Sequence, residues 1–335
     1  MDFKDFHTGK DDISRRLDKV IRIFAADLSL GEIYKAIRKG LIKVNNRKTK
    51  SDYRIQENDT ISIASFLINK ADSKGPHLDS PSPTKNNLKM PEIVFENDAI
   101  LLLNKPYDIN VHGDDNSLDK IVTQYYNSKP HSQNLSFKPG PIHRLDRKTT
   151  GLVAFSMNLE GAKWFSENIK SHTIQKKYWG LAEGTLESQE IWKDNISKAD
   201  ASGSPKSFHT VVATGFNEDD TQESKTEGQL AETIATPLAR GAYRGHPVTL
   251  IEYNIKTGRK HQIRAQSGRH GHPLLGDVTY GGQKPAPGNQ QIYLTAKELT
   301  FPKDNPLTLP GKLKISLPAP FKSILNSCGI EISDV

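Results

Sequence analysis

The sequence of 335 residues contains a single cysteine, Cys328, and no long apolar run. One thiol cannot close a disulfide within the chain, and it cannot supply a zinc site that needs several thiolates. Apolar runs such as 99–103 are far shorter than the roughly 18 residues that a membrane-spanning helix requires. The first six residues are charged and lack the apolar core of a signal peptide. We therefore expect a soluble protein in a reducing cytoplasm.

Positive charge is concentrated in one short window. The whole chain has a formal net charge of +7. Residues 35–54 contain eight Lys or Arg residues against one acid, Asp52, which gives this window 8 − 1 = +7. Charge of this kind fits nucleic-acid binding and an ordinary solvated surface equally well. The cations are Lys35, Arg38, Lys39, Lys43, Arg47, Lys48, Lys50 and Arg54.

The first 64 residues have the pattern of a small α/β domain. Apolar residues at helical spacing predict a first helix that starts near Ser14. Ser29 and Glu32 form a capping-box pattern at the start of a second helix, and Gly40 predicts its end. Short strands are expected at 41–44 and 60–64.

Asp146 lies in a segment that the rest of the chain is expected to support. Proline and glycine precede this segment, 139–153, and an apolar run follows it, which predicts a loop that leads into a buried strand. Neighbouring positive charge lowers an Asp pKa by roughly 1–3 units, so Asp146 is a candidate nucleophile or base. For so short a pattern, an acid in surface ion pairs is the alternative. The neighbouring cations are Arg144, Arg147 and Lys148.

The longer string around Asp146 resembles a known family signature. His143-Arg144-Leu145-Asp146, followed by Thr149-Thr150-Gly151, is similar to the motif of the RluA-type family of pseudouridine synthases. Thr150 stands where Ser is commoner. The resemblance implies that Asp146 is catalytic and that Arg144 fills the space left by a flipped base. We also expect His143 and Thr150 to contribute to substrate binding.

A second block resembles the same family. Residues 257–264 read Thr-Gly-Arg-Lys-His-Gln-Ile-Arg, and residues 271–282 continue with a Gly-His-Pro-Leu-Leu-Gly-Asp motif. Lys260 stands where Thr is usual, and Ala265-Gln266 stands where Val-His is usual. The resemblance implies that Arg264 pairs with the catalytic Asp and that Ile263 lines the pocket of the base.

Two further segments match the family in part. Lys176-Lys177-Tyr178 resembles a strand segment of the family. The resemblance implies that Tyr178 lies in the active site and helps to move the proton from C5 of the target uracil. The alternative is an ordinary tyrosine of a strand. Asn104-Lys105-Pro106 resembles an element in which Gly occupies the position of Asp108. Asp tolerates positive φ better than most residues, so the turn is expected to form. Lys105 is interpreted as a support or a phosphate contact.

The N-terminal segment resembles the alpha-L RNA-binding domain. The resemblance rests on 16–19 and on 37–46, in which Asn46 stands where Gly is commoner. Cations on the second helix and the following turn would contact phosphates without reading sequence. The residues expected to bind RNA are Lys35, Arg38, Lys39, Lys43, Arg47 and Lys48.

These observations predict an α+β protein with three parts. Residues 1–65 form the small α/β RNA-binding domain, 66–91 a flexible linker rich in Ser, Pro, Asn and Lys, and 92–335 the catalytic domain. The catalytic domain is expected to be a mixed, mainly antiparallel sheet with flanking helices and closing strands near the C-terminus. Segment 189–229 has the weakest pattern. It contains loop-like stretches at 200–206 and 217–223, and the acidic one, 217–223, is expected to face away from RNA.

The predicted function is isomerisation of specific uridines to pseudouridine, and the expected substrate is large-subunit (23S) ribosomal RNA. The alternatives are a tRNA pseudouridine synthase and an inactive RNA-binding assembly factor on the same fold. A glycoside hydrolase ranks low because the motif offers no second carboxylate. We expect RNA as the partner, a monomer, and no cofactor or metal. Four histidines could suggest a metal site, but their spacing fits no familiar one: His143, His261, His270 and His272.

Overall fold

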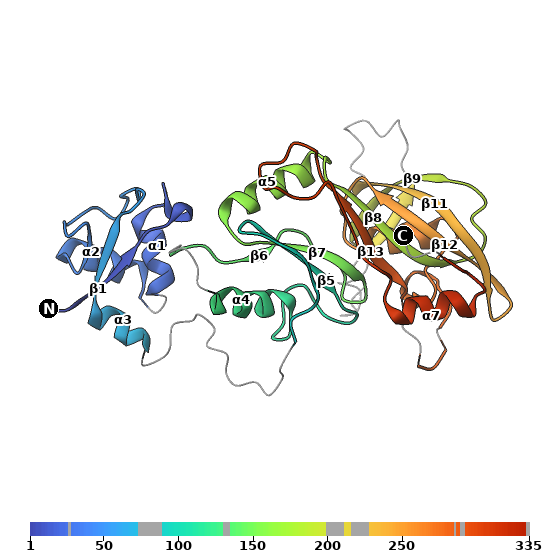
Figure 1. Ribbon diagram of the computed structural model, residues 1–335, viewed down its shortest axis with the longest axis horizontal. Helices are drawn as coiled ribbons and strands as arrows, with labels where there is room; N and C mark the ends of the chain where they lie inside the picture. The colour runs from blue at the N-terminus through green and yellow to red at the C-terminus, as the bar shows by residue number, and fades with distance from the viewer. Residues whose placement is uncertain are drawn as a thin grey trace. The chain divides into compact units, whose positions relative to one another are not determined.

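The computed structural model in Figure 1 describes residues 1–25, 28–72, 89–129, 135–198, 211–215, 228–284, 286–288 and 292–332. Its contacts divide the chain into two units. The first comprises Met1–Met90, Lys120–Gly140 and Ser156–Gly161, and the second comprises Pro91–Asp119, Pro141–Phe155 and Ala162–Val335.

Two helices of the first unit begin and end for local reasons. Helix α2 (Leu30–Lys39) has the predicted capping box: Ser29 Oγ accepts from the Glu32 amide, the Glu32 carboxylate accepts from the Ser29 amide at 2.8 Å, and Gly40 ends the helix at φ 71°. Helix α1 (Leu17–Phe24) begins three residues later than predicted. Ser14 has φ 63° and its amide donates to the carbonyl of Ile55, so it cannot join the helix.

A three-stranded sheet completes this part of the first unit, in the order β1-β3-β2. The predicted strands are present as β2 (Ile42–Val44) and β3 (Thr60–Ala64), whereas β1 (Phe3–His7) was not predicted. Helix α3 (Ser65–Asp72) occupies the start of the predicted linker, and residues 73–88 of that linker lie outside the described residues. The buried core includes Leu17, Val20, Ile21, Ile33, Ile37, Ile42, Ile55, Ile61 and Ile63.

Leu135, Ser136 and Leu159 contact the 3₁₀ turn η1 (Lys10–Asp12) within the first unit. The Asp12 carboxylate accepts from the Leu135 amide at 2.9 Å and from the Ser136 hydroxyl. The Asp11 carboxylate accepts from the Leu159 amide at 3.1 Å. The contacts therefore group 120–140 and 156–161 with the N-terminal segment, although the sequence assigned both to the catalytic domain.

The second unit is dominated by an 11-stranded sheet. The strand order is β10-β9-β11-β12-β8-β13-β7-β5-β4, with β14 paired to β13 and β6 paired to β7. The pairings of β8 to β12 and of β9 to β11 are antiparallel, and β7 runs parallel to β13. Figure 1 shows β8, β11, β12 and β13 side by side. The strands are β4 (Ile93–Glu96), β5 (Ile100–Lys105), β6 (Gly140–Pro141), β7 (Thr150–Ser156), β8 (Gln175–Glu183), β9 (Glu190–Lys198), β10 (Val211–Gly215), β11 (Gln229–Tyr243), β12 (His246–Ile255), β13 (Leu294–Thr300) and β14 (Lys312–Lys314).

The other described helices of the chain are α4 (Leu118–Ser128), α5 (Leu159–Lys170), α6 (Gln262–Arg269) and α7 (Ala319–Ser327), with a 3₁₀ turn η3 (Val278–Tyr280). Most of α4 and the first residues of α5 belong to the first unit. Strands β9 and β10 were not predicted, and the expected loops at 200–206 and 217–223 lie outside the described residues. The expected closing strands are present as β13 and β14, and α7 begins at the end of that stretch. The proline of α7 is in its first turn, where the missing amide costs no hydrogen bond.

Helices α6 and α7 use opposite faces of the sheet. Trp179 and Leu181 of β8 pack in one cluster with Phe321 of α7. Tyr178 alternates with them and therefore points to the other face, where its cross-strand neighbour Tyr253 accepts a hydrogen bond from Ser267 of α6 at 3.1 Å. Tyr178 and α6 thus share one face of the sheet. Within the described residues, no helix has the length and apolar character needed to cross a membrane.

Gly151 lies at the start of β7, directly after the loop that contains Asp146. Its φ is 110°, and it pairs with Ala296 in the parallel β7–β13 pair. A Cβ atom at this position would lie 2.4 Å from the carbonyl oxygen of Ala296, which leaves no room for any other residue. This close approach explains why the motif ends in glycine.

Candidate active site

Lys105 supports the loop that contains Asp146. Its side chain is fully buried, and its ammonium donates to the carbonyls of Pro106, Ile109 and Arg147 at 3.0, 2.8 and 2.9 Å. These three bonds use all its protons. Burial lowers the pKa of Lys105 to about 7, against the opposing effect of the Asp146 charge. Of the two roles expected for Lys105, the geometry favours loop support over phosphate contact.

Asp108 tolerates the turn that glycine normally occupies. It has φ 65°, and its carboxylate pairs with the Arg147 guanidinium, with Nε–Oδ1 2.9 Å and Nη2–Oδ2 3.1 Å. Both side chains are more than half exposed. Arg147 was expected to be a cation next to Asp146, but its guanidinium pairs with Asp108 instead, which ties the 106–109 turn to the catalytic loop.

Two residues of the second motif approach Asp146, whose side chain is 20 % exposed. Arg264 Nη1 lies 3.8 Å from Asp146 Oδ2, and His261 Nε2 lies 3.7 Å from Asp146 Oδ1. Burial lowers the pKa of His261 to about 4, although the Asp146 charge opposes this change. Because the His261 ring is therefore neutral at neutral pH, Arg264 is the positive partner of Asp146 on this side.

Arg264 is held by a second, deeper carboxylate. Its Nε and Nη2 donate to Asp277 at 2.7 and 2.9 Å, and Asp277 is only 1 % exposed. The guanidinium also lies 5.0 Å from the ring centroid of Tyr280. This bidentate pair leaves Nη1 to face Asp146. Asp277 and Tyr280 both belong to the 271–282 motif, whose sequence alone does not indicate that they contact Arg264.

Tyr280 orients His261. The two side chains meet at 2.8 Å between Oη and Nδ1, and Oη also accepts from the Val211 amide at 3.1 Å. We assign the Tyr280 proton to the bond with Nδ1, which leaves the ring proton of His261 on Nε2, facing Asp146.

Tyr178 is buried on the face of the sheet that α6 covers. Burial, and to a lesser extent the charge of Asp146, raise the pKa of its phenol well above the ordinary value. Tyr178 is therefore a neutral phenol in the free enzyme.

The other predicted substrate-binding residues occupy different environments. His143 accepts from the Ala154 amide at Nε2 and stacks on Phe165; burial, with a smaller effect from Lys176, lowers its pKa to about 3. Thr150 is buried, and its hydroxyl bonds to Thr295 at 2.7 Å. These two residues support the loop and β7. The remaining two are Arg144, which is exposed, and Ile263, which is buried on α6.

The predicted RNA-binding cations lie on one part of the first unit. Lys35, Arg38 and Lys39 are exposed on α2, and Arg47 and Lys48 are exposed after β2. Lys43 is half-buried, with its ammonium 4.5 Å from the centroid of the Phe3 ring. A hollow of about 590 Å³ is lined by Arg16, Tyr34, Arg38 and Lys50, among others.

Asn45 and Asn46 form the turn after β2 in the left-handed conformation, with φ 49° and 61°. Asn tolerates this conformation, so the turn forms where glycine is commoner. Among the described residues, no group of three or more His, Cys, Asp or Glu could hold a metal ion.

The model of the family described as RNA pseudouridylate synthase matches residues 99–268, and that of the S4 domain matches residues 15–61. The first match spans half of the chain and contains Asp146, Tyr178 and Arg264. The chain therefore belongs to the RNA pseudouridylate synthase family and carries an N-terminal S4 domain. It is an isomerase that converts uridine to pseudouridine.

Among similar proteins, ribosomal large subunit pseudouridine synthase C of Haemophilus ducreyi is 27 % identical over 308 residues, which are 88 % of this chain and 87 % of the relative. The protein of that name from Escherichia coli is 25 % identical over 328 residues, 95 % of this chain and 93 % of the relative.

Two solved structures share the fold over most of this chain. Human RNA pseudouridylate synthase domain containing 4 superposes with a TM-score of 0.58 at 21 % identity, covering 72 % of this chain and 94 % of its own. Human RNA pseudouridylate synthase domain containing 1 gives 0.53 at 23 % identity, covering 72 % and 89 %.

Proposed function

We propose that this enzyme isomerises uridines of large-subunit ribosomal RNA and that Asp146 is its catalytic residue. The observation that carries the proposal is the convergence of Asp146 with Arg264, which a buried carboxylate holds in place. The substrate is inferred from the relatives named for the ribosomal large subunit, which match this chain over nearly its whole length. The S4 domain and its exposed cations support an RNA substrate.

The proposed chemistry breaks the bond between N1 of uracil and C1′ of ribose, turns the base, and forms a bond between C5 and C1′. The proton on C5 leaves and N1 gains one, so the reaction needs no oxidant and no added group. Asp146 acts at the ribose, either by attack on C1′ or by removal of a proton from C2′. Arg264 faces its carboxylate at 3.8 Å and orients it, and Tyr178 assists at C5.

A stacked uridine cannot present these atoms, so the target must leave the helix at a cost of a few kcal/mol. Arg144 is exposed on the loop two residues before Asp146. We propose that it occupies the space left by the flipped base.

We also propose the limits 1–65, 66–91 and 92–335 for the RNA-binding domain, linker and catalytic domain, and a monomer in the cytoplasm. A reducing compartment suits the single buried thiol, Cys328.

Mapping of pseudouridines tests the substrate. Unmodified large-subunit rRNA, small-subunit rRNA and tRNA are incubated separately with the purified protein and then mapped chemically. We expect new pseudouridines in large-subunit rRNA. Modification confined to tRNA would replace the proposed substrate. Tight RNA binding without modification of any of the three would instead indicate an inactive assembly factor.

The salt dependence of binding tests the S4 surface. Replacing Lys35, Arg38 and Lys39 with alanine should reduce the slope of log K against log salt by about 3, because each lost phosphate contact removes about 0.9 by analogy with B-DNA. The matched control replaces three exposed cations elsewhere in the first unit, Lys4, Lys19 and Arg22. Equal slopes for the two triple variants would argue against a specific RNA-binding role for α2.

A further inference from the structure

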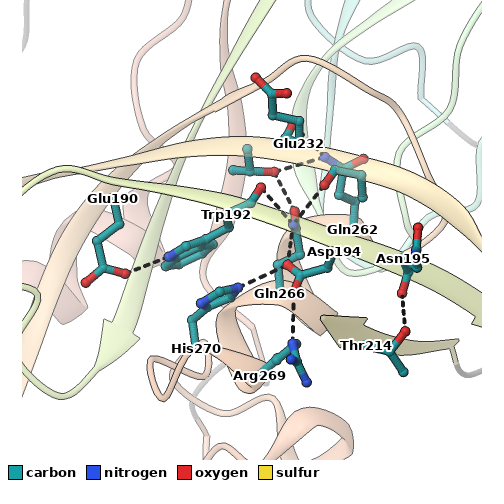
Figure 2. Close-up of polar contacts among 12 residues, drawn as sticks. Glu190, Trp192, Asp194, Asn195, Thr214, Glu232, Gln262, Gln266, Arg269 and His270 are labelled. Carbon is teal, nitrogen blue, oxygen red and sulfur yellow. Dashed lines mark hydrogen bonds and ion pairs between the residues drawn. The ribbon is translucent and has the colours of Figure 1, made fainter. Parts of the chain in front are cut away.

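Asp194 of β9 is a buried carboxylate that holds one side of α6. It is 1 % exposed, and Figure 2 shows three side chains that converge on it. Gln266 Nε2 and His270 Nε2 approach Oδ2 at 2.7 and 3.0 Å, and Arg269 Nε donates to Oδ1 at 2.8 Å. All three donors come from α6 or the residue that follows it. One carboxylate therefore anchors the C-terminal end of this helix to the sheet.

The network continues from Asp194 to the start of the helix. The amide oxygen of Gln266 accepts from the Thr233 hydroxyl at 2.6 Å, and that hydroxyl accepts from Gln262 Nε2 at 2.9 Å. Gln262 Oε1 in turn accepts from the Thr257 hydroxyl and the Arg259 amide at 2.7 and 3.0 Å. The chain of bonds joins β9, β11 and the loop before α6, so both ends of the helix are fixed.

The residues of α6 that make these bonds form one stripe. Gln262, Gln266, Arg269 and His270 are spaced i, i+4, i+7 and i+8, which places them on one side of a helix. Arg264 is two residues from Gln262 and Gln266, and therefore points away from the stripe, toward Asp277 and Asp146. Helix α6 is thus held to the sheet on one side, and the guanidinium of Arg264 projects from the other side.

We propose that Asp194 is a positioning residue for the isomerisation: it fixes the rotation of α6 about its own axis and thereby the placement of Arg264 beside Asp146. The proposal rests on the roles of Asp146 and Arg264 in the proposed function. A guanidinium lies about 6 Å from a helix axis, so a rotation of about 10° moves it by about 1 Å. A displacement of about 1 Å in a catalytic site can reduce the rate about 100-fold.

The three donors require an ionised acceptor with both oxygens available. Burial by itself raises the pKa of Asp194, but the hydrogen bonds from His270, Gln266 and Arg269 bring it below the ordinary value. Trp192, two residues earlier on β9, stacks on the His270 ring at 4.9 Å with an interplanar angle of 5°. An asparagine at 194 would keep the shape of the side chain, but its amide would face a donor.

The first test compares full-length wild type, Asp194→Asn and the control Glu298→Gln. Glu298 is also a buried carboxylate of this sheet with three donors nearby, Lys312, Lys314 and Thr300, but it is on β13. Single-turnover release of tritium from C5-labelled uridines in transcribed large-subunit rRNA gives the rate. Asp194→Asn should lower it about 10- to 100-fold at unchanged RNA affinity, as expected for a displacement of about 1 Å. Glu298→Gln should leave it unchanged.

A double-mutant cycle separates positioning from simple destabilisation. If Asp194 acts through Arg264, then Arg264→Lys should lower the rate at least about threefold less in the Asp194→Asn background than in wild type. Equal effects of Arg264→Lys in both backgrounds, or a wild-type rate for Asp194→Asn well below its melting temperature, would overturn the proposal.

An NMR measurement makes the outcome independent of catalysis. The Nε–Hε resonance of Arg264, assigned by its loss in Arg264→Lys, should shift in Asp194→Asn and stay in place in Glu298→Gln. An unchanged resonance in Asp194→Asn would refute the positioning role even if no tritium were released from any RNA. Failure of wild type to release tritium, with the resonance shift observed, would instead count against the proposed function alone.

Discussion

Asp146→Asn is expected to reduce the rate of pseudouridine formation by at least about 10⁴-fold, the scale on which loss of a reacting side chain acts in other enzymes. The amide of asparagine can neither attack C1′ nor remove a proton from C2′. RNA affinity should change by less than about threefold, because binding depends mainly on the cations that contact phosphate. Single-turnover tritium release and filter binding on the same rRNA measure the two quantities.

A parallel loss of rate and RNA affinity in Asp146→Asn would argue against a chemical role, because it would indicate a disturbed loop. The melting temperature provides the check on folding. Asp146 is partly exposed and Arg264, its positive partner, lies 3.8 Å away, so its neutralisation should have little effect on stability.

Asp277→Asn is expected to lower the free energy of unfolding of the second unit by about 3–5 kcal/mol, the usual cost of breaking a buried ion pair from one side. Arg264 would lose one of its two bonds to Asp277 and would remain charged in a buried position, 11 % exposed. Urea unfolding, followed by a probe in the second unit, measures the loss.

The matched control for Asp277→Asn is Asp108→Asn. Both carboxylates make two-point pairs with an arginine in the same unit, but Asp108 and Arg147 are more than half exposed. Exposed pairs contribute about 0–1 kcal/mol, so Asp108→Asn should cost no more than that. Similar losses for the two variants would contradict the buried, structural role of Asp277.

Local signals in the sequence predicted local structure well. The capping box of Ser29 and Glu32, the glycine that ends α2, and the positive φ of Asp108 follow from preferences of single residues or close neighbours. The loop at Asp146 was predicted correctly because proline and glycine precede it and a fully buried strand follows it.

The elements that were missed depend on distant partners. Strand β1 has only two aromatic residues among charged ones, and it forms because β3 presents a free edge to it. Strands β9 and β10 have weak patterns of their own; they pair with each other, and β9 also pairs with β11. Helix α7 begins in a proline-rich stretch that was interpreted as the end of strands.

The partners within the site were missed for a similar reason. Asp194 comes from a strand that carries no motif, so its hydrogen bond with Gln266 could not be predicted. Asp277 and Tyr280 belong to a motif, but the sequence of that motif does not indicate that they contact Arg264. Arg147 shows the converse: its proximity to Asp146 in sequence suggested an interaction, but the backbone turn directs it to Asp108. Only the tertiary structure specifies these pairings.

The position of β13 has a consequence for the order in which the enzyme is made. This strand lies between β7, which follows the Asp146 loop, and β8, which contains Tyr178. Its pairing with β7 joins residues about 145 positions apart, and such distant contacts form slowly. During synthesis, residues 150–156 of β7 therefore cannot pair with β13 until residues 294–300 have been made. We expect a nascent chain to acquire activity only after residues 294–300 have left the ribosome.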